Sequence, residues 1–316
     1  MINKKIKFGL IGLGHLGKYH LKHLSSFDFV EMVGIYDIDN QLSKNLALEY
    51  NIPKITDLEI LLNTADAVSI VTPTITHIEI ALKALEKKCH VFIEKPISHS
   101  VETANQIKKY TDNKIIHVGH IERFNPAFTT FMRKKHQPVF LECHRLTKIN
   151  NRSMDISVIL DLMIHDIDLL INLIDSPINE IIADGISVVS ENIDLANVKL
   201  IFKNGFLANL TASRISNKSM RKIRVFEKKL YTSIDLLNKE ISEYNAIQNQ
   251  DNQDFIFNVN KIKVQEQDAL ACELTHFCDA IFNKDYNNKN ISSAILALDV
   301  ANQINHIIQN KHNYPK

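Results

Sequence analysis

Short apolar runs alternate with amphipathic stretches through the first 120 residues of the chain. The runs have the length of buried strands, and the stretches between them repeat their apolar residues with helical spacing. This pattern predicts strands at residues 6–11, 30–36, 67–71, 90–93 and 115–118. It predicts a helix through Leu24 and further helices at residues 39–50, 57–63, 78–87 and 101–110. Strands separated by helices of this length favour a parallel, doubly wound α/β sheet.

Beyond residue 120, apolar and polar residues mostly alternate, which is typical of half-buried strands. Strands are predicted at residues 139–145, 181–189, 196–202, 206–213, 221–226, 230–235 and 240–244, with a hairpin at Asn204-Gly205. Helices are predicted at residues 126–134, 157–174, 269–282 and 292–309, and the polar residues 248–260 are expected to form a loop. We therefore expect two domains, an α/β domain at residues 1–120 and an α+β domain with a mostly antiparallel sheet at residues 121–316.

The first predicted strand ends in a glycine-rich turn, Gly12-Leu13-Gly14-His15-Leu16-Gly17, which opens the first helix. Such a turn presents backbone N–H groups and the positive end of a helix dipole to a pyrophosphate. Gly12 permits the turn, Gly14 lets the backbone approach phosphate, and Gly17 packs the helix on the strand. The turn, with His15 and Leu16, is therefore the predicted phosphate-binding part of a Rossmann domain at residues 1–120.

Asp37 ends the second predicted strand, 20 residues beyond Gly17. A carboxylate at this place accepts hydrogen bonds from a ribose 2′-hydroxyl and repels a 2′-phosphate, so NAD is favoured over NADP as the cofactor. The alternative is a glycine turn in an unrelated βα unit, with Asp37 as a helix cap.

The residues that follow the other strands matter because ligands of a doubly wound sheet bind outside the carboxyl ends of its strands. Thr72-Pro73-Thr74 is expected to lie along the dinucleotide, and a turn that caps the next helix explains it equally well. That helix is predicted to begin with a capping box from Thr76 to Glu79. His77 and Glu94 complete the residues predicted to contact the cofactor.

Lys95 lies directly after the buried fourth strand, between Glu94 and Pro96. At the ligand edge of the sheet its ammonium can donate to a substrate hydroxyl and stabilise an alkoxide-like oxygen as hydride leaves. We therefore predict that Lys95 is catalytic and also contacts the cofactor. The alternative is a structural Glu94–Lys95 pair on the surface.

One polar stripe runs along the otherwise apolar helix predicted at residues 157–174. It contains Asp161, His165, Asp168 and Asn172. A helix that is apolar on its other faces is buried, so the stripe must meet a cleft, a ligand or itself. Asp161 precedes His165 by one turn and can fix the imidazole tautomer, which predicts a general base with its orienting carboxylate. A core histidine and a metal site are the alternatives, but no H-E-x-x-H motif supports a metal.

Several motifs are similar to those of the glucose–fructose oxidoreductase and inositol dehydrogenase family, often called Gfo/Idh/MocA. They are G-L-I-G-L-G-H-L-G at residues 9–17, Thr72-Pro73-Thr74, T-H-I-E-I-A-L-K-A-L at residues 76–85 and H-V-F-I-E-K-P at residues 90–96. The resemblance covers essentially the whole chain. It implies an NAD-dependent dehydrogenase of sugars, sugar nucleotides or cyclitols, with Lys95, Asp161 and His165 as the catalytic group. Lys88 departs from the pattern, because the family usually has a glycine that ends this helix.

Within the family, residues 118–128, 161–168, 211–214 and 230–235 most resemble the UDP-N-acetylglucosamine 3-dehydrogenase group. This resemblance implies oxidation of C3 to a 3-keto sugar nucleotide, which an aminotransferase then aminates for lipid A-type glycolipids. UDP-N-acetylglucosaminuronate 3-dehydrogenases, inositol dehydrogenases and a non-catalytic NAD-binding sensor are the alternatives. Family members commonly pair through the exposed face of the second sheet, so a homodimer or homotetramer is expected.

Four polar residues are candidate substrate contacts: Glu122, Arg123, Asn125 and Asp168. Asn125 and Pro126 also have a structural explanation, as the N-cap and first residue of a helix. Glu122 and Arg123 have no such explanation in the sequence. We predict that all four residues bind the substrate in the second domain.

Charge and composition limit the classes of molecule that the protein is expected to bind. Of the 316 residues, 45% are hydrophobic and 23% are charged, and the net charge is +1, which argues against nucleic acid or a membrane as the main partner. Lys218, Arg221, Lys222 and Arg224 are expected to form a solvated strand face, with an anionic ligand as the alternative. We expect no signal peptide and no membrane span. The four cysteines are scattered, which favours reduced thiols in a cytoplasmic protein.

Overall fold

The computed structural model of the protein describes residues 5–149, 156–248, 255–287 and 289–312. The chain forms two compact units. Unit 1 comprises Met1–Ile121 and Leu270–Leu298, and unit 2 comprises Glu122–Ala269 and Asp299–Lys316. Helix α9 (Lys289–His312) belongs to unit 1 as far as Leu298 and to unit 2 beyond it. No helix in the described ranges is long and apolar enough to cross a lipid bilayer.

A parallel sheet of five strands forms the centre of unit 1 in the described part of the chain. Its strands are β1 (Ile6–Ile11), β2 (Val30–Tyr36), β3 (Ala67–Ile70), β4 (His90–Glu94) and β5 (Ile116–Gly119). Their order in the sheet is β2-β1-β3-β4-β5, so the direction in which strands are added reverses between β1 and β3. Such sheets bind ligands outside the carboxyl ends of the strands at this reversal. The predicted doubly wound α/β sheet is thus confirmed.

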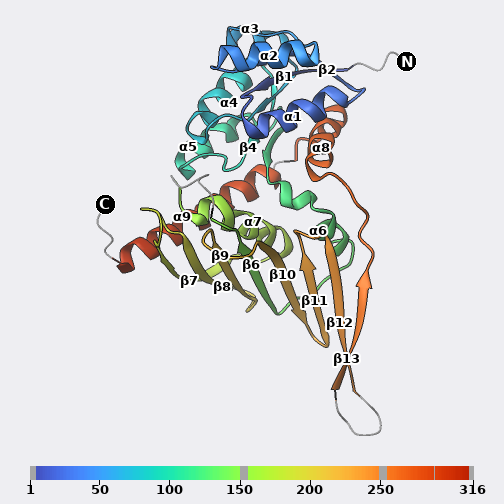
Figure 1. The fold of residues 1–316 in the computed structure, drawn as a ribbon, viewed down its shortest axis with the longest axis vertical. Coiled ribbons are helices and arrows are strands. Elements are labelled where there is room, and N and C mark those ends of the chain that lie inside the picture. The colour runs from blue at the N-terminus through green and yellow to red at the C-terminus, as the bar shows by residue number, and fades with distance from the viewer. Residues whose placement is uncertain (1–4, 150–155, 249–254, 288, 313–316) are drawn as a thin grey trace. The chain divides into compact units, whose positions relative to one another are not determined.

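Helices cover both faces of the parallel sheet (Figure 1). On one face, Phe8 of β1 and Phe92 of β4 contact Phe277 of α8 (Ala269–Asn283), and α1 (His15–Ser26) contributes Leu24 to the same core. On the other face lies α3 (Leu58–Thr64), whose Leu61 occupies the space beside the glycines of β1 and β2. Helices α2 (Asn40–Tyr50) and α4 (His77–Glu86) follow β2 and β3 in the sequence and complete the alternation of strands and helices.

The division of the chain places α8 in unit 1, whereas the sequence had suggested one domain for all of residues 121–316. The physical reason is the apolar face of α8. Its residues Leu270, Leu274, Phe277 and Cys278 are buried against the first sheet. A helix late in the sequence thus completes a core that the first 120 residues do not close by themselves.

Two predictions for unit 1 need correction. The helix predicted at residues 101–110 consists of α5 (Val101–Asn105) and a 3-10 helix at Gln106–Tyr110. The capping box is wrong, because the Thr76 hydroxyl donates to Pro73 O and to Thr72 Oγ1, at 2.8 Å in each case, and no side chain caps α4. Lys88 ends α4 with a φ of 68°, the left-handed conformation that the missing glycine implied.

An eight-stranded sheet forms the described part of unit 2, in the order β13-β12-β11-β10-β6-β9-β8-β7 (Figure 1). The strands are β6 (Phe140–Leu146), β7 (Ile178–Ile186), β8 (Leu195–Phe202), β9 (Leu207–Ser213), β10 (Met220–Glu227), β11 (Leu230–Asp235), β12 (Glu240–Gln248) and β13 (Phe255–Ile262). Within the described part of this second sheet, only β6 and β9 are parallel neighbours. The predicted mostly antiparallel sheet and its hairpin at Gly205, where φ is 85°, are confirmed.

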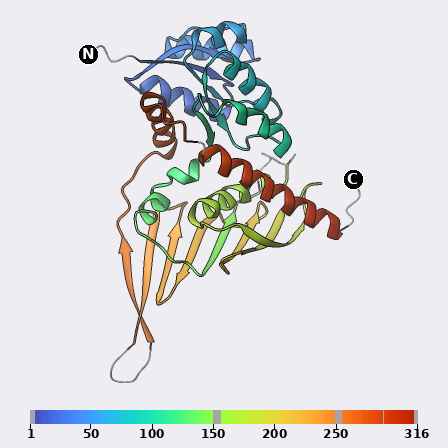
Figure 2. The ribbon, with the colours of Figure 1, turned by 180° about the vertical axis from the view of Figure 1, so that it is seen from behind.

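Helices cover one face of this second sheet (Figure 2). They are α6 (Pro126–Phe131), α7 (Ile164–Leu173) and the part of α9 that belongs to unit 2. Ile308 of α9 lies beside Gly185 of β7, and Lys311 Nζ donates to Asp184 at 2.9 Å. The inward residues of β6 on this face are Leu141, Cys143 and Arg145.

The loop predicted at residues 248–260 is wrong where the structure describes it. Residues 255–262 form β13, which pairs antiparallel with β12 from Ile241↔Ile262 to Gln248↔Phe255. Residues 256–260 are exposed, so burial imposes no apolar alternation on this edge strand. Its backbone pairing, rather than its side chains, defines the strand. Residues 249–254 of the predicted loop lie outside the described residues.

Candidate active site

The glycine turn after β1 has the close packing that the spacing predicted. Gly12 has a φ of 91°, and a Cβ here would lie 2.4 Å from Val71 O. A Cβ on Gly17 would lie 2.1 Å from Gly12 O, so only glycine lets α1 approach the turn this closely. At Gly14, by contrast, nothing lies within 4 Å of the Cβ position. This side of the turn is open to a ligand.

The start of α1 supplies donors to that open side. Gly14 is the N-cap of α1, and no side chain caps the helix. The first-turn N–H groups have no partner within a helix, and they carry the positive end of the helix dipole. His15 and Leu16, both predicted cofactor contacts, are exposed in this first turn. The arrangement fits a pyrophosphate.

Asp37 lies against the glycine turn, although 24 residues separate it from Leu13. Leu13 N–H donates to Asp37 Oδ2 at 2.6 Å, and Asp39 N–H donates to Asp37 Oδ1 at 2.8 Å. Asp39, not Asp37, is the N-cap of α2, so the alternative role of Asp37 as a helix cap is wrong. A carboxylate has about four acceptor sites, and further lone pairs of Asp37 remain for a ribose hydroxyl.

Thr72, Pro73 and Thr74 follow β3 and lie beside the same turn, since Thr72 Cγ2 is 3.0 Å from the Cβ position at Gly12. Pro73 O accepts from Thr76 N–H at 2.9 Å, and residues Thr74–Thr76 form a 3-10 turn before α4. The turn that was the alternative for these residues is therefore present. Contact with the dinucleotide stays a prediction.

His77 ties the loop after β3 to the loop after β4. Its Nε2 lies 2.8 Å from Thr72 O and its Nδ1 lies 3.0 Å from Pro96 O. Burial lowers the pKa of His77, and the two carbonyl oxygens oppose this change. Both ring nitrogens face backbone carbonyl oxygens, so His77 positions the two loops, and its contact with the cofactor stays a prediction.

A buried chain of hydrogen bonds holds Glu94. Glu94 Oε1 accepts from His20 Nε2 at 3.0 Å, and His20 Nδ1 lies 3.0 Å from Ser69 Oγ. Burial acts to raise the pKa of Glu94, but the hydrogen bond from His20 and the charges of His20 and Lys95 outweigh it and hold this pKa below its usual value. His20 was missed in the sequence. Its signal was its place on the buried face of α1, with Gly17, Leu21 and Leu24.

Lys95 follows the carboxyl end of β4, as predicted. Its backbone N–H donates to Glu94 Oε2 at 3.2 Å, and its side chain is partly exposed. The alternative of an exposed Glu94–Lys95 pair is wrong for Glu94, whose side chain is 12% exposed and bonded to His20. Both neighbours of Lys95 are thus anchored, Glu94 by His20 and Pro96 by His77.

Asp161 and His165 share one helical segment of unit 2. A π-helix at Ile159–Met163 leads directly into α7, where one regular helix was predicted. Ile164 N–H reaches back to Ile159 O, five residues earlier. Such π turns are frequent at functional sites. Asp161 and His165 are partly buried, and their assignment as orienting carboxylate and base stays a prediction.

Two of the four predicted substrate contacts bind each other. Arg123 Nε donates to Asp168 Oδ2 at 2.7 Å, and Arg123 Nη2 donates to Asp168 Oδ1. This two-point pairing fixes both side chains in the plane of the guanidinium. Asn172, from the same predicted stripe, donates to Asp168 O at 2.7 Å.

The other two, Glu122 and Asn125, have structural roles. Asn125 caps α6 by accepting from Ala127 N–H at 3.1 Å, and its Nδ2 donates to Glu122 Oε2 at 3.1 Å. Arg145 Nη1 donates to Glu122 Oε1 at 2.7 Å, and Arg221 Nη1 lies 3.3 Å from the same oxygen. These bonds account for Glu122, for which the sequence offered no structural reason. A direct contact with substrate stays a prediction for all four residues.

Arg145, which the sequence did not single out, is the centre of a buried charge network. Its side chain is 2% exposed and bonds to Glu122 and, through Nη2 at 2.7 Å, to Asp166 of α7. Burial would lower the pKa of Arg145, but the two carboxylates outweigh it and raise this pKa. Burial also raises the pKa of Asp166, whereas Arg145 holds the pKa of Glu122 down against burial. The network ties α7 to β6 and to residue 122.

The basic residues of β10 are only partly the solvated face that was predicted. Arg221 pairs with Glu122, and Arg224 Nη1 lies 3.2 Å from Glu142 Oε2. Both arginine side chains keep more than a third of their surface exposed. Within the described residues, no group of three or more His, Cys, Asp or Glu side chains is placed to hold a metal ion.

A Rossmann-type unit with an open glycine turn, an acid at the end of β2 and a lysine after β4 defines an NAD-binding oxidoreductase. Residues 6–120 match the oxidoreductase family with an NAD-binding Rossmann fold, and residues 115–229 match the GFO/IDH/MocA C-terminal domain. The chain belongs to the Gfo/Idh/MocA family, as its motifs predicted. It is an NAD-dependent dehydrogenase of this family.

Similar proteins include dehydrogenases of a sugar nucleotide and of a cyclitol. UDP-N-acetylglucosamine 3-dehydrogenase from Acidithiobacillus ferrooxidans is 33% identical over 280 residues, which cover 87% of this chain and 88% of the relative. A solved structure of UDP-N-acetylglucosamine 3-dehydrogenase from that organism gives a TM-score of 0.89 at 30% identity, with 98% of this chain and 99% of the other covered. Myo-inositol 2-dehydrogenase from Thermotoga maritima is 27% identical over 66% of this chain and 69% of the relative.

Asp37→Asn is expected to weaken the preference for NAD. The amide keeps an oxygen for Leu13 N–H but removes the charge that repels a 2′-phosphate and accepts from the ribose. We expect the ratio of kcat/KM for NAD⁺ to kcat/KM for NADP⁺ to fall about tenfold or more, because a hydrogen bond to a charged group contributes about 1.5–3 kcal/mol. Steady-state kinetics with both cofactors measure this ratio.

Asp39→Asn is the matched control, since Asp39 accepts from Gln41 N–H and Leu42 N–H as the cap of α2. Asparagine caps helices as well as aspartate does, so the ratio should not change. An unchanged ratio in Asp37→Asn as well would refute the role of Asp37.

Proposed function

We propose that the protein oxidises C3 of UDP-N-acetylglucosamine to the 3-keto sugar nucleotide with NAD⁺. The observation that carries this proposal is the similarity to UDP-N-acetylglucosamine 3-dehydrogenase at 33% identity, which extends over 87% of the chain. The fold alone does not choose the substrate, because proteins that act on different polyols share it. Similarity at the level of sequence through most of the chain favours the sugar nucleotide over a cyclitol.

The catalytic group in this proposal is Lys95, Asp161 and His165. NAD⁺, when bound, accepts the hydride that leaves C3. His165 removes the proton of the 3-hydroxyl, and Asp161, four residues earlier, orients the imidazole and stabilises its protonated form. Lys95 donates a hydrogen bond to the same oxygen and stabilises the negative charge that develops on it. The alcohol loses one proton and one hydride, which balances its oxidation to a ketone.

The anchoring of Lys95 supports this role. A catalytic amine acts efficiently only if it is held in place before the substrate arrives. Glu94, on one side, is bonded to His20, whose side chain is 1% exposed. Pro96, on the other side, is bonded to His77. The two residues that flank Lys95 are thus bound to helices, Glu94 to α1 and Pro96 to α4. The side chain of Lys95 itself remains partly exposed.

A substrate panel tests the proposal. The protein is mixed with NAD⁺ and, separately, UDP-N-acetylglucosamine, UDP-N-acetylglucosaminuronate and myo-inositol, and formation of reduced nicotinamide is followed by absorbance. We expect kcat/KM to be highest for UDP-N-acetylglucosamine by about tenfold or more, because polar groups of a site built for one substrate stay unpaired with another. Mass spectrometry should show a product lighter by two hydrogen atoms.

The other outcomes identify the alternatives. Preference for UDP-N-acetylglucosaminuronate or myo-inositol would assign the protein to those dehydrogenases. Tight binding of NAD⁺ without turnover of any of the three would favour a non-catalytic NAD-binding sensor. The presence of both a lysine after β4 and an Asp161–His165 pair argues against a sensor, which has no need of a base.

We also propose the partners that this activity implies. A 3-keto sugar nucleotide is a substrate for an aminotransferase, and lipid A-type glycolipids use such aminated sugars. Two or four copies of the chain are proposed to associate through the face of the second sheet that carries no helix. On that face Phe226, Tyr231 and Tyr244 stack in succession across three strands, with ring centroids 4.9 Å apart at each step. Aromatic surface of this kind is enriched at interfaces.

A further inference from the structure

A cavity of about 1090 Å³ lies at the amino ends of the strands of unit 1. Each strand contributes to its lining at or just before its first residue: Lys5, Phe29, Asp66, His90 and Lys114. The glycine turn, Asp37 and Lys95 follow the carboxyl ends of the same parallel strands. The cavity is therefore at the opposite edge of the sheet from the cofactor site. Its volume suits a small-molecule ligand.

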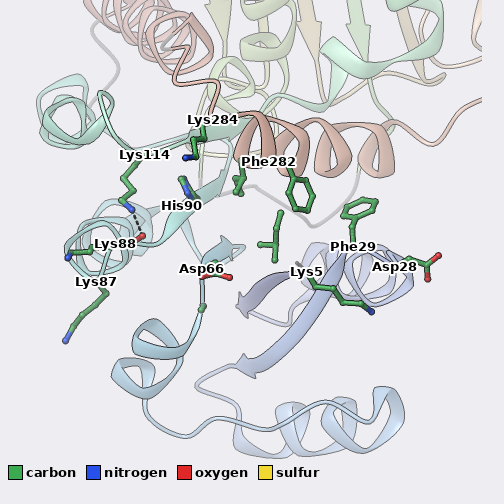
Figure 3. A pocket seen from close by; sticks show the side chains of 13 residues that line it. Lys5, Asp28, Phe29, Asp66, Lys87, Lys88, His90, Lys114, Phe282 and Lys284 are labelled. Atoms are coloured by element: carbon green, nitrogen blue, oxygen red, sulfur yellow. Dashed lines mark hydrogen bonds between the residues drawn. The ribbon is translucent and has the colours of Figure 1, made fainter. Parts of the chain in front are cut away.

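One side of this cavity is basic. Figure 3 shows Lys114, Lys284 and His90 close together on it. Lys114 Nζ donates to Lys88 O at 2.5 Å, which places the amine at the cavity wall. Burial lowers the pKa of Lys114, Cys89 opposes this change, and the charge of Lys88 adds a smaller lowering, so an anion beside Lys114 would stabilise its charged form. In the described part of the chain, neither Lys114 nor Lys284 forms an ion pair with a carboxylate.

His90 adds a donor whose direction is fixed. Its Nδ1 accepts from Ile115 N–H at 2.9 Å, so this nitrogen carries the lone pair and Nε2 carries the proton. Burial lowers the pKa of His90 to about 4, and the ring is therefore neutral at physiological pH. A neutral N–H donor between two ammonium groups suits an oxyanion.

The other side of the cavity is apolar. Phe29 and Phe282 lie there edge to face, with ring centroids 6.3 Å apart (Figure 3). Ile281 also lines the cavity. Phe282 keeps 46% of its surface exposed, although aromatic side chains of this size are usually well covered. A flat ring placed here would cover both phenyl groups.

The lysines also have a simpler explanation, since α4 and α8 end beside the cavity and cations stabilise helix C-termini. That explanation extends to Lys114, whose Nζ donates to Lys88 O just beyond the end of α4, but it does not account for His90 or for the two phenyl groups that line the same cavity. It also leaves unexplained why Lys88 and Lys284 take left-handed conformations, with φ of 68° and 53°, at places where glycine is favoured. Lys229 and Lys239 do the same at turns of unit 2, but only Lys88 and Lys284 border a common cavity.

Formal charge agrees with an anionic ligand. The lining contains five lysines and two aspartates, with a formal excess of three positive charges. Lys87 Nζ forms an ion pair with Glu59 Oε2 at 2.8 Å, so its charge is already balanced. Asp66 Oδ2 accepts from the backbone N–H of Lys7 at 3.1 Å. The remaining lysines still exceed the aspartates by two. Lys88, Lys114 and Lys284 lie away from the two phenyl groups, whereas Lys5 lies near Phe29 (Figure 3). A ligand with its charge at one end and its ring at the other therefore matches most of this charge and the aromatic side together.

We propose that this cavity binds a small anion that carries a flat ring, of the size and chemistry of a nucleoside monophosphate. Lys114, Lys284 and His90 bind the phosphate, and Phe29 and Phe282 cover the base. This site is separate from the dinucleotide site, and the proposal does not depend on which sugar the enzyme oxidises.

Calorimetric titration of the whole protein with AMP tests the site. NADH is present at saturating concentration, so that AMP cannot occupy the cofactor site. We expect AMP to bind, with an affinity that does not change when NADH is doubled. Adenosine and inorganic phosphate should each bind at least about tenfold more weakly than AMP, because each fills only one side of the cavity. Failure of AMP to bind, or competition between AMP and NADH, would overturn the proposal.

Two variants and one control locate the site. Lys114→Gln combined with Lys284→Gln should weaken AMP binding about tenfold or more, since two charge-assisted bonds are lost. Lys284→Gln alone avoids any effect on the Lys114–Lys88 bond and should weaken AMP in the same direction. Lys108→Gln, at an exposed position of unit 1 outside the cavity, should have no effect. Equal affinity of all four proteins for AMP would show that it binds elsewhere.

Discussion

His165→Ala should lower kcat for UDP-N-acetylglucosamine oxidation by about 10²–10⁴-fold, the usual contribution of a general base. The affinity for NAD⁺ should stay within about twofold, because the glycine turn and Asp37, which are predicted to bind the dinucleotide, belong to unit 1 and are unchanged. The loss should therefore appear in kcat and in kcat/KM alike. Stopped-flow and steady-state absorbance measure the rate, and fluorescence of bound NADH measures the cofactor affinity.

Lys95→Met should reproduce this loss of rate if the amine stabilises the same oxygen. His306→Ala is the matched control, because His306 is exposed on α9 and its ring contacts Asn310 of the same helix. It should retain full activity. Full activity of His165→Ala would remove the base assignment, while full activity of Lys95→Met would remove only the role of the lysine.

The first sheet and the glycine turn were predictable because their signals are local. Buried parallel strands read as continuous apolar runs, and the turn needs glycine at fixed spacing whatever surrounds it. Gly12 and Gly17 face backbone oxygens at 2.4 and 2.1 Å from a Cβ position, so no other residue satisfies the turn. Asp37 was found for the same reason, since its distance from the turn follows from one helix and one strand.

The contacts that hold the candidate site were not predictable, because they join residues far apart in the sequence. Arg145 lies 21 residues from Asp166 and 23 from Glu122, and His20 lies 74 residues from Glu94. Each of the two residues nevertheless carries a weak signal in the sequence. Arg145 follows Leu141 and Cys143 on the inward face of β6, and His20 lies on the buried side of α1. A polar residue at a position that the period assigns to the core indicates a buried partner.

The partners of the predicted substrate-binding residues were not predictable for a related reason. Glu122 and Arg123 were predicted because the sequence shows no structural purpose for them, and Asp168 because it lies on the polar stripe of its helix. These residues form ion pairs within unit 2: Glu122 pairs with Arg145, and Arg123 pairs with Asp168. Spacing along a helix identifies residues on one face, but it does not show whether a side chain from another element already occupies that face.

Arg145→Met should cost about 3–5 kcal/mol of the free energy of unfolding. The guanidinium is 2% exposed and bonds two carboxylates whose side chains are 6% and 4% exposed. Methionine has a similar volume but leaves Asp166 buried without its cation and leaves Glu122 with only the partly exposed Arg221, and a buried charge that loses its partner is strongly destabilising. Urea unfolding followed by circular dichroism measures the change, and activity should fall with stability because Asp166 lies next to His165 on α7.

The loss in Arg145→Met should depend on pH. Without the guanidinium, burial raises the folded-state pKa of Asp166 further above its unfolded value, and a raised carboxyl pKa stabilises the fold at low pH and destabilises it as the pH rises. The difference from the natural protein should therefore shrink from about pH 8 toward about pH 5. Arg224→Met, which breaks the half-exposed pair with Glu142, should cost less than about 1 kcal/mol and show little of this dependence. If the two variants lost equal stability at every pH, the buried network would not be what fixes α7 to the sheet, and the alignment of Asp161 and His165 would have to come from the packing of α7 alone.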